Sequence, residues 1–166
     1  MNSIFKRRSI RKFTETPVTE EQIQQLLRAA MAAPSAHNKQ PWEFVLTTKR
    51  ETLDKLADNH PYAKMLKQAP LCIVVCANPS KQEEEGFYVQ DCSAAIQNIL
   101  IEAVEINLGT VWIGLHPHEN LQNQVREIFN MPSDIVPISM IAIGNPDEEK
   151  HEITRYKEEI IHREIY

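Results

Sequence analysis

A cluster of basic residues near the N-terminus is the first candidate for chemistry, because it could capture an anion. Lys6, Arg7, Arg8, Arg11 and Lys12 fall within seven residues that contain no acid. The whole chain carries a net charge of −5, and without this cluster 13 basic and 23 acidic residues leave −10. A compact positive patch on an acidic body favours local anion binding, although a solvated basic face or an unstructured targeting tail would share this composition.

The spacing within the cluster indicates a convergent site. A helical turn over residues 3–8 would pack Ile4 and Phe5 inward and close at Arg7 and Arg8.

In the extended segment that follows, alternation places Ile10 apart from Ser9 and Arg11. Arg7, Ser9 and Arg11 can then meet on one ligand. Guanidinium groups and a hydroxyl suit a terminal phosphate, so we expect a phosphorylated small molecule.

Charge and hydropathy exclude several partners. The acidic remainder would repel a nucleic-acid backbone, so we expect no nucleic-acid partner. No apolar run approaches the roughly 18–20 residues of a membrane span, and the basic N-terminus lacks the apolar core of a secretory signal. We expect a cytoplasmic protein that does not bind membranes.

The cysteines and histidines raise a metal or redox alternative. Cys72 and Cys76 are expected on one face of a buried strand as small core residues, and the odd number of cysteines fits a reducing compartment. His116-Pro117-His118 together with His37 could supply metal ligands, but no third ligand of suitable spacing is evident. We therefore expect no metal site.

Hydrophobic periodicity predicts one α+β domain over residues 1–166, with 42% hydrophobic and 25% charged residues. A helix from Thr19 has its apolar face at Ile23, Leu26, Leu27, Ala30 and Met31 and stops at Pro34. Thr19 and Gln22 form a capping box at its start. The other expected elements are helices over 49–58, 84–107 and 119–130 and strands over 42–47, 71–77, 109–114 and 135–143.

The helix expected over 84–107 is apolar on more than one side, so it must be buried on more than one side. In so short a chain the second side predicts contact with another subunit. The charged segment 147–166 carries a few apolar residues near its end and is expected to wrap across that neighbour. We predict a homodimer.

Three segments, 7–13, 33–42 and 109–114, together resemble the nitroreductase family of FMN-dependent oxidoreductases. The resemblance spans nearly the whole chain, including the long central helix. It implies an α/β/α sandwich on a mixed central sheet. It also implies a dimer whose C-terminal segment extends over the partner, with FMN in two interface clefts.

By this resemblance, Arg7, Arg8 and Ser9 would hold the phosphate and ribityl chain, and Arg11 would face the flavin N1 and O2 edge. A cation suits that edge because the reduced flavin carries negative charge there. A surface salt bridge is the alternative for Arg11. In the tail only Arg155 matches the family's pair of basic phosphate ligands, and Arg8 or Lys150 could replace the second.

The partner's loop would contribute further cofactor contacts, although a polar helix-to-strand connection is the simpler interpretation. Its residues are Pro34, Ser35, Ala36, Asn38 and Gln40. Ile113, Gly114 and Leu115 would lie beside the flavin's central ring, with a main-chain amide near N5, unless Gly114 merely ends a strand.

The implied activity is hydride transfer from NADH or NADPH to flavin N5, followed by ping-pong transfer to nitroaromatic, quinone or related small-molecule acceptors. The cofactor carries that chemistry, so no side chain is expected to be catalytic. A non-enzymatic FMN carrier or sensor is the alternative. The connection over 78–85 is short where larger relatives insert lid helices, which predicts an open channel and broad acceptor tolerance.

Overall fold

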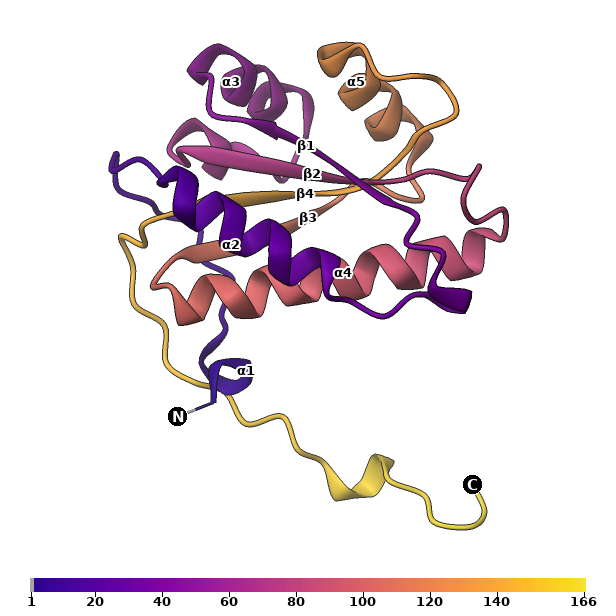
Figure 1. Ribbon diagram of the computed structural model, residues 1–166. Coiled ribbons are helices and arrows are strands. Elements are labelled where there is room, and N and C mark those ends of the chain that lie inside the picture. Colours follow the sequence, from indigo (N-terminus) through magenta and orange to yellow (C-terminus); the bar gives the residue numbers. More distant parts are fainter. Residues whose placement is uncertain (1) are drawn as a thin grey trace.

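A four-stranded sheet with the order β1-β2-β4-β3 forms the centre of the computed structural model, which describes residues 2–166 (Figure 1). The strands are β1 (Trp42–Thr47), β2 (Leu71–Ala77), β3 (Gly109–Gly114) and β4 (Val136–Gly144). Every ladder between them is antiparallel. A parallel pairing occurs at the isolated bridge between Ser9 and Thr110, so the expected mixture of strand directions is confined to that bridge.

Helices cover both faces of this sheet, which confirms the α/β/α arrangement. In Figure 1, α2 (Glu20–Met31) and α4 (Glu85–Glu105) lie on one side, and α3 (Arg50–Asn59) and α5 (Glu119–Phe129) lie on the other. Within residues 2–166, no helix combines the length and apolar character needed to cross a membrane.

The start of α2 shows how local sequence positions an element. Thr19 accepts a hydrogen bond from the Gln22 backbone, and the Gln22 side chain accepts one from the Thr19 backbone, which confirms the capping box. Ile23 is buried with the core, but Met31 is 54% exposed, so its expected burial is wrong. At about 100° per residue, Met31 is rotated about 80° from Ile23 and faces solvent at the helix end.

Strand β2 is buried on both faces, and its alternating side chains enter two separate cores. Ile73 and Val75 pack with α2 and α4, whereas Cys72, Val74 and Cys76 pack with α3 and α5. The two cysteines therefore share one face, as expected. At about 3.3 Å per residue their Cα atoms are about 13 Å apart, too far for a disulfide.

The two ends of the chain lie away from the sandwich. The short helix α1 (Ser3–Lys6) leaves Ile4 and Phe5 54% and 60% exposed, so their expected inward packing is wrong. A four-residue helix can turn only one side to the body, and Ser3 takes that place by donating to the Glu105 carboxylate.

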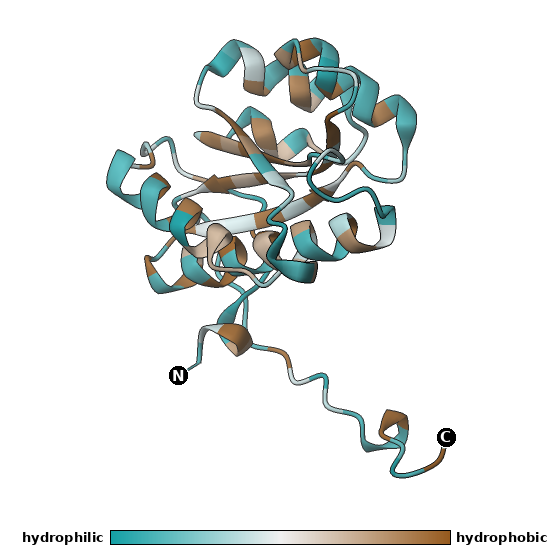
Figure 2. Ribbon diagram, turned by 45° about the vertical axis from the view of Figure 1, so that its right-hand side comes forward, coloured by the Kyte–Doolittle hydropathy of each residue, from teal (hydrophilic) through white to brown (hydrophobic). Residues whose placement is uncertain are grey.

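The C-terminal tail carries its apolar residues clear of the body, as Figure 2 shows in brown at its far end. It contains a single short 3₁₀ turn at Glu158–Ile160 within the described residues. The exposed apolar side chains are Ile153, Tyr156, Ile160, Ile161, Ile165 and Tyr166. Within residues 2–166, these apolar side chains stay exposed although the start of the tail lies beside α1.

Candidate functional site

The N-terminal segment runs beside β3 and fixes the position of the basic cluster. Ser9 bridges Thr110, and the Ile10 N–H donates to the Thr110 carbonyl at 2.9 Å. On the other side of this segment, the Lys150 ammonium donates to the Ser9 carbonyl at 2.6 Å. The backbone between the arginines is thereby held by two elements distant in sequence.

Three arginines line a cavity of about 350 Å³ between α1 and the tail, which we call the arginine cavity. Its lining residues are Ile4, Phe5, Arg7, Arg8, Ile153, Arg155 and Tyr156. None of the three guanidinium groups forms an ion pair with a described residue. Burial and the positive charges of Arg155 and Arg8 lower the pKa of Arg7. These arginines therefore form an uncompensated cationic site that suits a phosphate.

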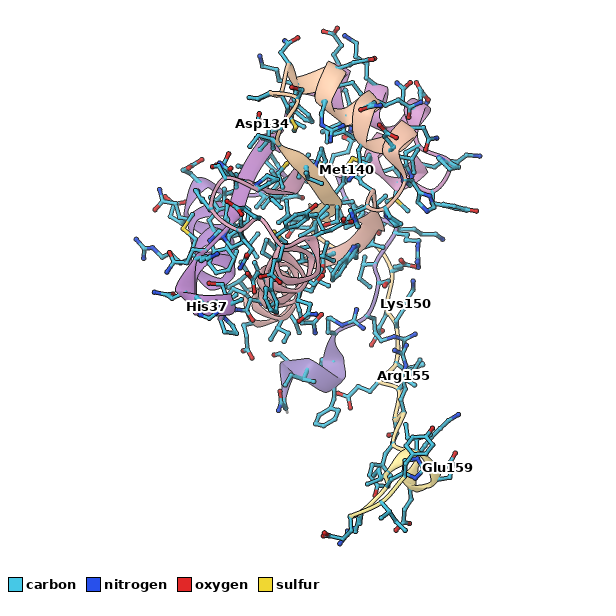
Figure 3. All side chains as sticks on the ribbon, turned by 90° about the vertical axis from the view of Figure 1, so that its right-hand side faces the viewer. His37, Asp134, Met140, Lys150, Arg155 and Glu159 are labelled. Carbon is cyan, nitrogen blue, oxygen red and sulfur yellow. The ribbon has the colours of Figure 1, made fainter. Side chains whose placement is uncertain are left out.

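The tail supplies Arg155 to this site but not Lys150. Figure 3 shows both residues where the tail leaves the body. Lys150 pairs with Glu148 at 3.1 Å and donates to Ser9, whereas the Arg8 guanidinium donates to the His151 carbonyl and also lines the arginine cavity. Arg8 and Lys150 were the two candidates for the second phosphate contact. Of these, Arg8 lines the same cavity as Arg155 and Lys150 does not.

A larger cavity of about 1050 Å³ lies along the free edge of β3, and we call it the edge cavity. Arg11, Trp112, Ile113 and Gly114 line one side, and residues 59–65 together with the start of α5 line the other. An added Cβ on Gly114 would meet no atom within 4 Å. The strand end is thus open to a flat ligand that packs directly against its backbone.

Both cavities are lined by arginine side chains. Among residues 2–166, no aspartate or glutamate lines either of them. Glu148 accepts from the Arg11 backbone N–H at 2.5 Å and pairs with Lys150. The Arg11 guanidinium itself forms no ion pair within the described chain. The N-terminal cluster therefore directs positive charge into both cavities.

Leu115 plays a different part from its two predecessors. Its side chain is fully buried, its N–H donates to Ile138, and its carbonyl accepts from His118. Leu115 therefore anchors the strand end from inside the core and has no free polar group for a ligand.

The loop after α2 has an unusual backbone. His37, Asn38 and Gln40 have φ values of 53°, 55° and 48°, the left-handed region that non-glycine residues rarely adopt. The Gln40 N–H donates to the Ser35 hydroxyl, and the Gln40 amide donates to the Asn38 side chain, both at 2.9 Å. These bonds hold the loop in one shape, and Pro34, Asn38 and Gln40 remain exposed.

Within one protomer, the loop and the arginine cavity are at opposite ends of α4, whereas the edge cavity extends along β3 to His116, which contacts Glu85 at the start of α4. Ala36 bonds to Asp91 near the start of α4, and Ser3 bonds to Glu105 at its end. At 1.5 Å per residue, these anchors are about 21 Å apart along the helix. Figure 3 shows His37 far from Lys150 and Arg155. None of the predicted loop residues, Pro34 to Gln40, lines either cavity.

Sequence reasoning missed two polar residues that shape the site. His60 and Asp91 are each only 6% exposed and bond to Gly114 and Ala36 respectively. Asp91 is an acid within the apolar pattern of α4, which was an available signal. His60 precedes Pro61, and such a pair indicates the end of a helix but gives no sign of a contact with Gly114.

One of the histidines of the alternative metal site, His116, has another partner. The His116 ring contacts the Glu85 carboxylate at 2.8 Å. Within residues 2–166, no group of three His, Cys, Asp or Glu side chains is placed to hold a metal ion.

Comparison with known proteins places this architecture in a family. The model of the nitroreductase family matches residues 4–60 and 56–145. A protein of Methanothermobacter thermautotrophicus, with the provisional name NADH dehydrogenase/NAD(P)H nitroreductase, is 44% identical over 148 residues, covering 89% of this chain and 78% of its own. The chain belongs to the nitroreductase family.

Solved structures of the nitroreductase family share its fold over almost the whole chain. An FMN-dependent nitroreductase from Clostridium difficile is 30% identical with a TM-score of 0.92, covering 99% of both chains. A provisionally assigned nitroreductase from Desulfovibrio desulfuricans, solved in complex with FMN, is 28% identical with a TM-score of 0.84 and covers 99% of this chain and 95% of its own.

Proposed function

We propose that this nitroreductase-family protein is an FMN-dependent NAD(P)H oxidoreductase. The observation that carries the proposal is the arrangement of two carboxylate-free cavities along the N-terminal segment. One is lined by three arginines that form no ion pair within residues 2–166, and the other borders an open strand edge at Gly114. A phosphate joined to a flat polar ring system is the ligand class that this donor set fits. The FMN-dependent relatives support the same cofactor.

Five residues of this chain would each have a defined part in holding FMN. Arg7, Arg8 and Arg155 would bind the phosphate, and Ser9 would bind the ribityl chain between the two cavities. Arg11 would place its guanidinium at the N1 and O2 edge, where positive charge stabilises the negative charge of reduction. When bound, FMN supplies the redox chemistry by accepting hydride at N5 and releasing electrons to an acceptor.

The backbone at the end of β3 would donate a hydrogen bond to flavin N5. The Thr110 carbonyl points away from β4, because it accepts from Ile10 on the outer side. Alternate residues of an antiparallel strand direct their N–H and C=O groups to the same side, so Gly114 also points outward. The Gly114 N–H would donate to N5 in the edge cavity, without a side chain in between.

A homodimer would complete this site. If α4 packs against α4 of a second copy about a two-fold axis, the two ends of the helix exchange places. The loop over Pro34–Gln40 of one protomer then lies near the N-terminal segment of the other, which borders both cavities. The half-buried Ile101 and Val104 on α4 and the exposed apolar residues of the tail supply surface for this contact.

The protein would reduce electron acceptors of more than one chemical class. Residues 78–84 line neither cavity, so the short connection before α4 does not cover the edge cavity. We infer that NAD(P)H and the acceptor use this opening in turn, as a ping-pong mechanism requires, and that nitroaromatics and quinones are both accepted.

An anaerobic reduction experiment separates the oxidoreductase from a non-enzymatic FMN carrier. The FMN-loaded protein is mixed with NADH or NADPH, and its visible absorbance is followed. Bleaching by either donor, with colour returning on addition of a quinone or nitroaromatic, supports the oxidoreductase. A yellow protein that neither donor bleaches would identify a carrier or sensor, and a protein that does not take up FMN would contradict both. Parallel double-reciprocal plots in a two-substrate assay would support the ping-pong order.

A further inference from the structure

The buried side chain of His60 connects two elements at the edge cavity. His60 follows α3, and its Nε2 lies 3.0 Å from the carbonyl oxygen of Gly114 at the end of β3. Its side chain lines the edge cavity although the residue is only 6% exposed. In a buried imidazole, both ring nitrogens are expected to have hydrogen-bond partners.

The hydrogen bond at Nδ1, the second ring nitrogen, shows which nitrogen of His60 carries the proton. The backbone N–H of Tyr62 donates to Nδ1 of His60 at 3.1 Å, so Nδ1 acts as an acceptor. In a neutral imidazole the other nitrogen is then the donor, and Nε2–H donates to the Gly114 carbonyl. The Tyr62 ring packs edge-on against the imidazole, with centroids 6.2 Å apart, and fixes its orientation further.

The contact matters because of where Gly114 lies. The peptide unit between Gly114 and Leu115 is held on its N–H side by the Ile138 carbonyl and on its C=O side by His60. Glycine has the widest backbone freedom of any residue, so an unheld strand end here would sample several orientations. The N–H of Gly114 belongs to the preceding peptide unit and faces the same edge as the carbonyl. The two units meet at the Gly114 Cα, so holding the carbonyl limits the φ and ψ angles that set the direction of the N–H.

We propose that His60 is a positioning residue that orients the Gly114 backbone for the ligand of the edge cavity. It acts on bound FMN through Gly114 and contacts no reacting atom, and this assignment rests on the proposed function. Because the Gly114 N–H is the expected donor to flavin N5, loss of the His60 contact alters both the affinity for FMN and its midpoint potential.

Two substitutions separate this role from simple structural support. In H60N the amide oxygen is close to the position of Nδ1 and preserves the acceptor for Tyr62, but it cannot reach Gly114. In H60Q the amide nitrogen is close to the position of Nε2 and preserves the donor to Gly114. If only packing matters, the two variants behave alike.

The test measures FMN dissociation constants and midpoint potentials for wild type, H60N and H60Q, together with the melting temperature of each apoprotein. We expect H60N to bind FMN about tenfold more weakly, the equivalent of one lost hydrogen bond, with a shifted potential. H60Q should stay within about twofold of wild type. Equal affinities and potentials in the two variants would overturn the assignment, whatever their melting temperatures. Failure of the wild type to bind FMN would instead overturn the proposed function and, with it, this role.

A measurement on the wild type keeps the assignment testable should either variant fail to fold. Long-range ¹H–¹⁵N correlations of the His60 ring report its tautomer directly. The Nε2–H form supports the assignment, and an Nδ1–H form would exclude donation to Gly114 and overturn it.

Discussion

The carboxylate of Asp91 on α4 accepts a hydrogen bond from the backbone N–H of Ala36 at 2.9 Å and so anchors the loop after α2. Asp91 is buried, and its second oxygen has no partner among the described residues. The loop that it holds contains three residues with positive φ, a conformation that persists only when its surroundings enforce it.

Replacing Asp91 should therefore loosen the loop. We expect Asp91→Ala to lower the free energy of unfolding by about 1.5–3 kcal/mol and to weaken FMN binding, because in the proposed dimer this loop would complete the partner's site. Denaturant unfolding and FMN titration measure the two effects. Asp91→Asn keeps an acceptor for Ala36 and should be the milder change. Equal FMN affinity in Asp91→Ala and wild type would show that this loop has no part in the site.

The arginine cavity predicts a ligand-specific effect of charge. Arg7→Gln and Arg155→Gln should each weaken FMN binding about tenfold, because each removes a charge-assisted hydrogen bond to the phosphate. Riboflavin lacks the phosphate, so its affinity should not change. Fluorescence titrations with both flavins make the comparison, and Lys67→Gln on the opposite helical layer serves as a distant charge control. Equal losses for FMN and riboflavin would contradict phosphate binding at this cavity.

Two glycines of β3 should respond differently to the same substitution. Gly114→Ala should fold normally, because its Cβ meets nothing within 4 Å, but it should reduce FMN affinity by occupying the ring's place. Gly109→Ala should destabilise the fold instead, because its Cβ would come within 2.8 Å of Ile10. Thermal melts and FMN titrations of both variants test the contrast. Unimpaired FMN binding by Gly114→Ala would place the flavin elsewhere.

The buried cysteines should be inert in the folded protein. Burial raises the pKa of Cys72, Cys76 and Cys92 to about 12, so at about pH 8 they remain protonated and unreactive toward thiol reagents. In the unfolded chain their pKa is near the ordinary thiol value of 9.0. Thiolates therefore form first in the unfolded state, and stability should fall as pH rises from about 9 through about 12. Thiol titration with and without denaturant checks this, and rapid labelling of the native protein would contradict it.

Local sequence patterns predicted most elements because each carried its own signal. The capping box at Thr19, the shared strand face of Cys72 and Cys76, and the strand over Gly109–Gly114 were all found as expected. Tertiary placement was harder to predict. Ile4 is apolar, but nothing in its neighbours shows that α1 lies at the margin of the body.

The grouping of Arg7, Arg8 and Arg155 around one cavity was anticipated, whereas the contact of His60 with Gly114 was not. Arg7 and Arg8 lie next to each other in the chain, and their convergence with Arg155 was expected from the resemblance to a family. His60 meets Gly114 across 54 residues, and no periodicity encodes such a contact. Only the three-dimensional arrangement reveals it.

The central claim is that each FMN is held by the N-terminal arginines of one protomer and the loop over Pro34–Gln40 of its partner. Mixing two defective proteins tests it most directly. One carries Arg7→Gln with Arg155→Gln, and the other carries Asn38→Ala with Gln40→Ala, so each homodimer has two impaired sites.

After dissociation and random reassociation, mixed dimers contain one intact site and one doubly impaired site. We predict that the mixture recovers high-affinity FMN binding at about a quarter of all sites, as counted by titration against the two parent proteins. If the mixture binds FMN no better than its parents, the arginines and the loop do not meet across a subunit interface, and the account is wrong.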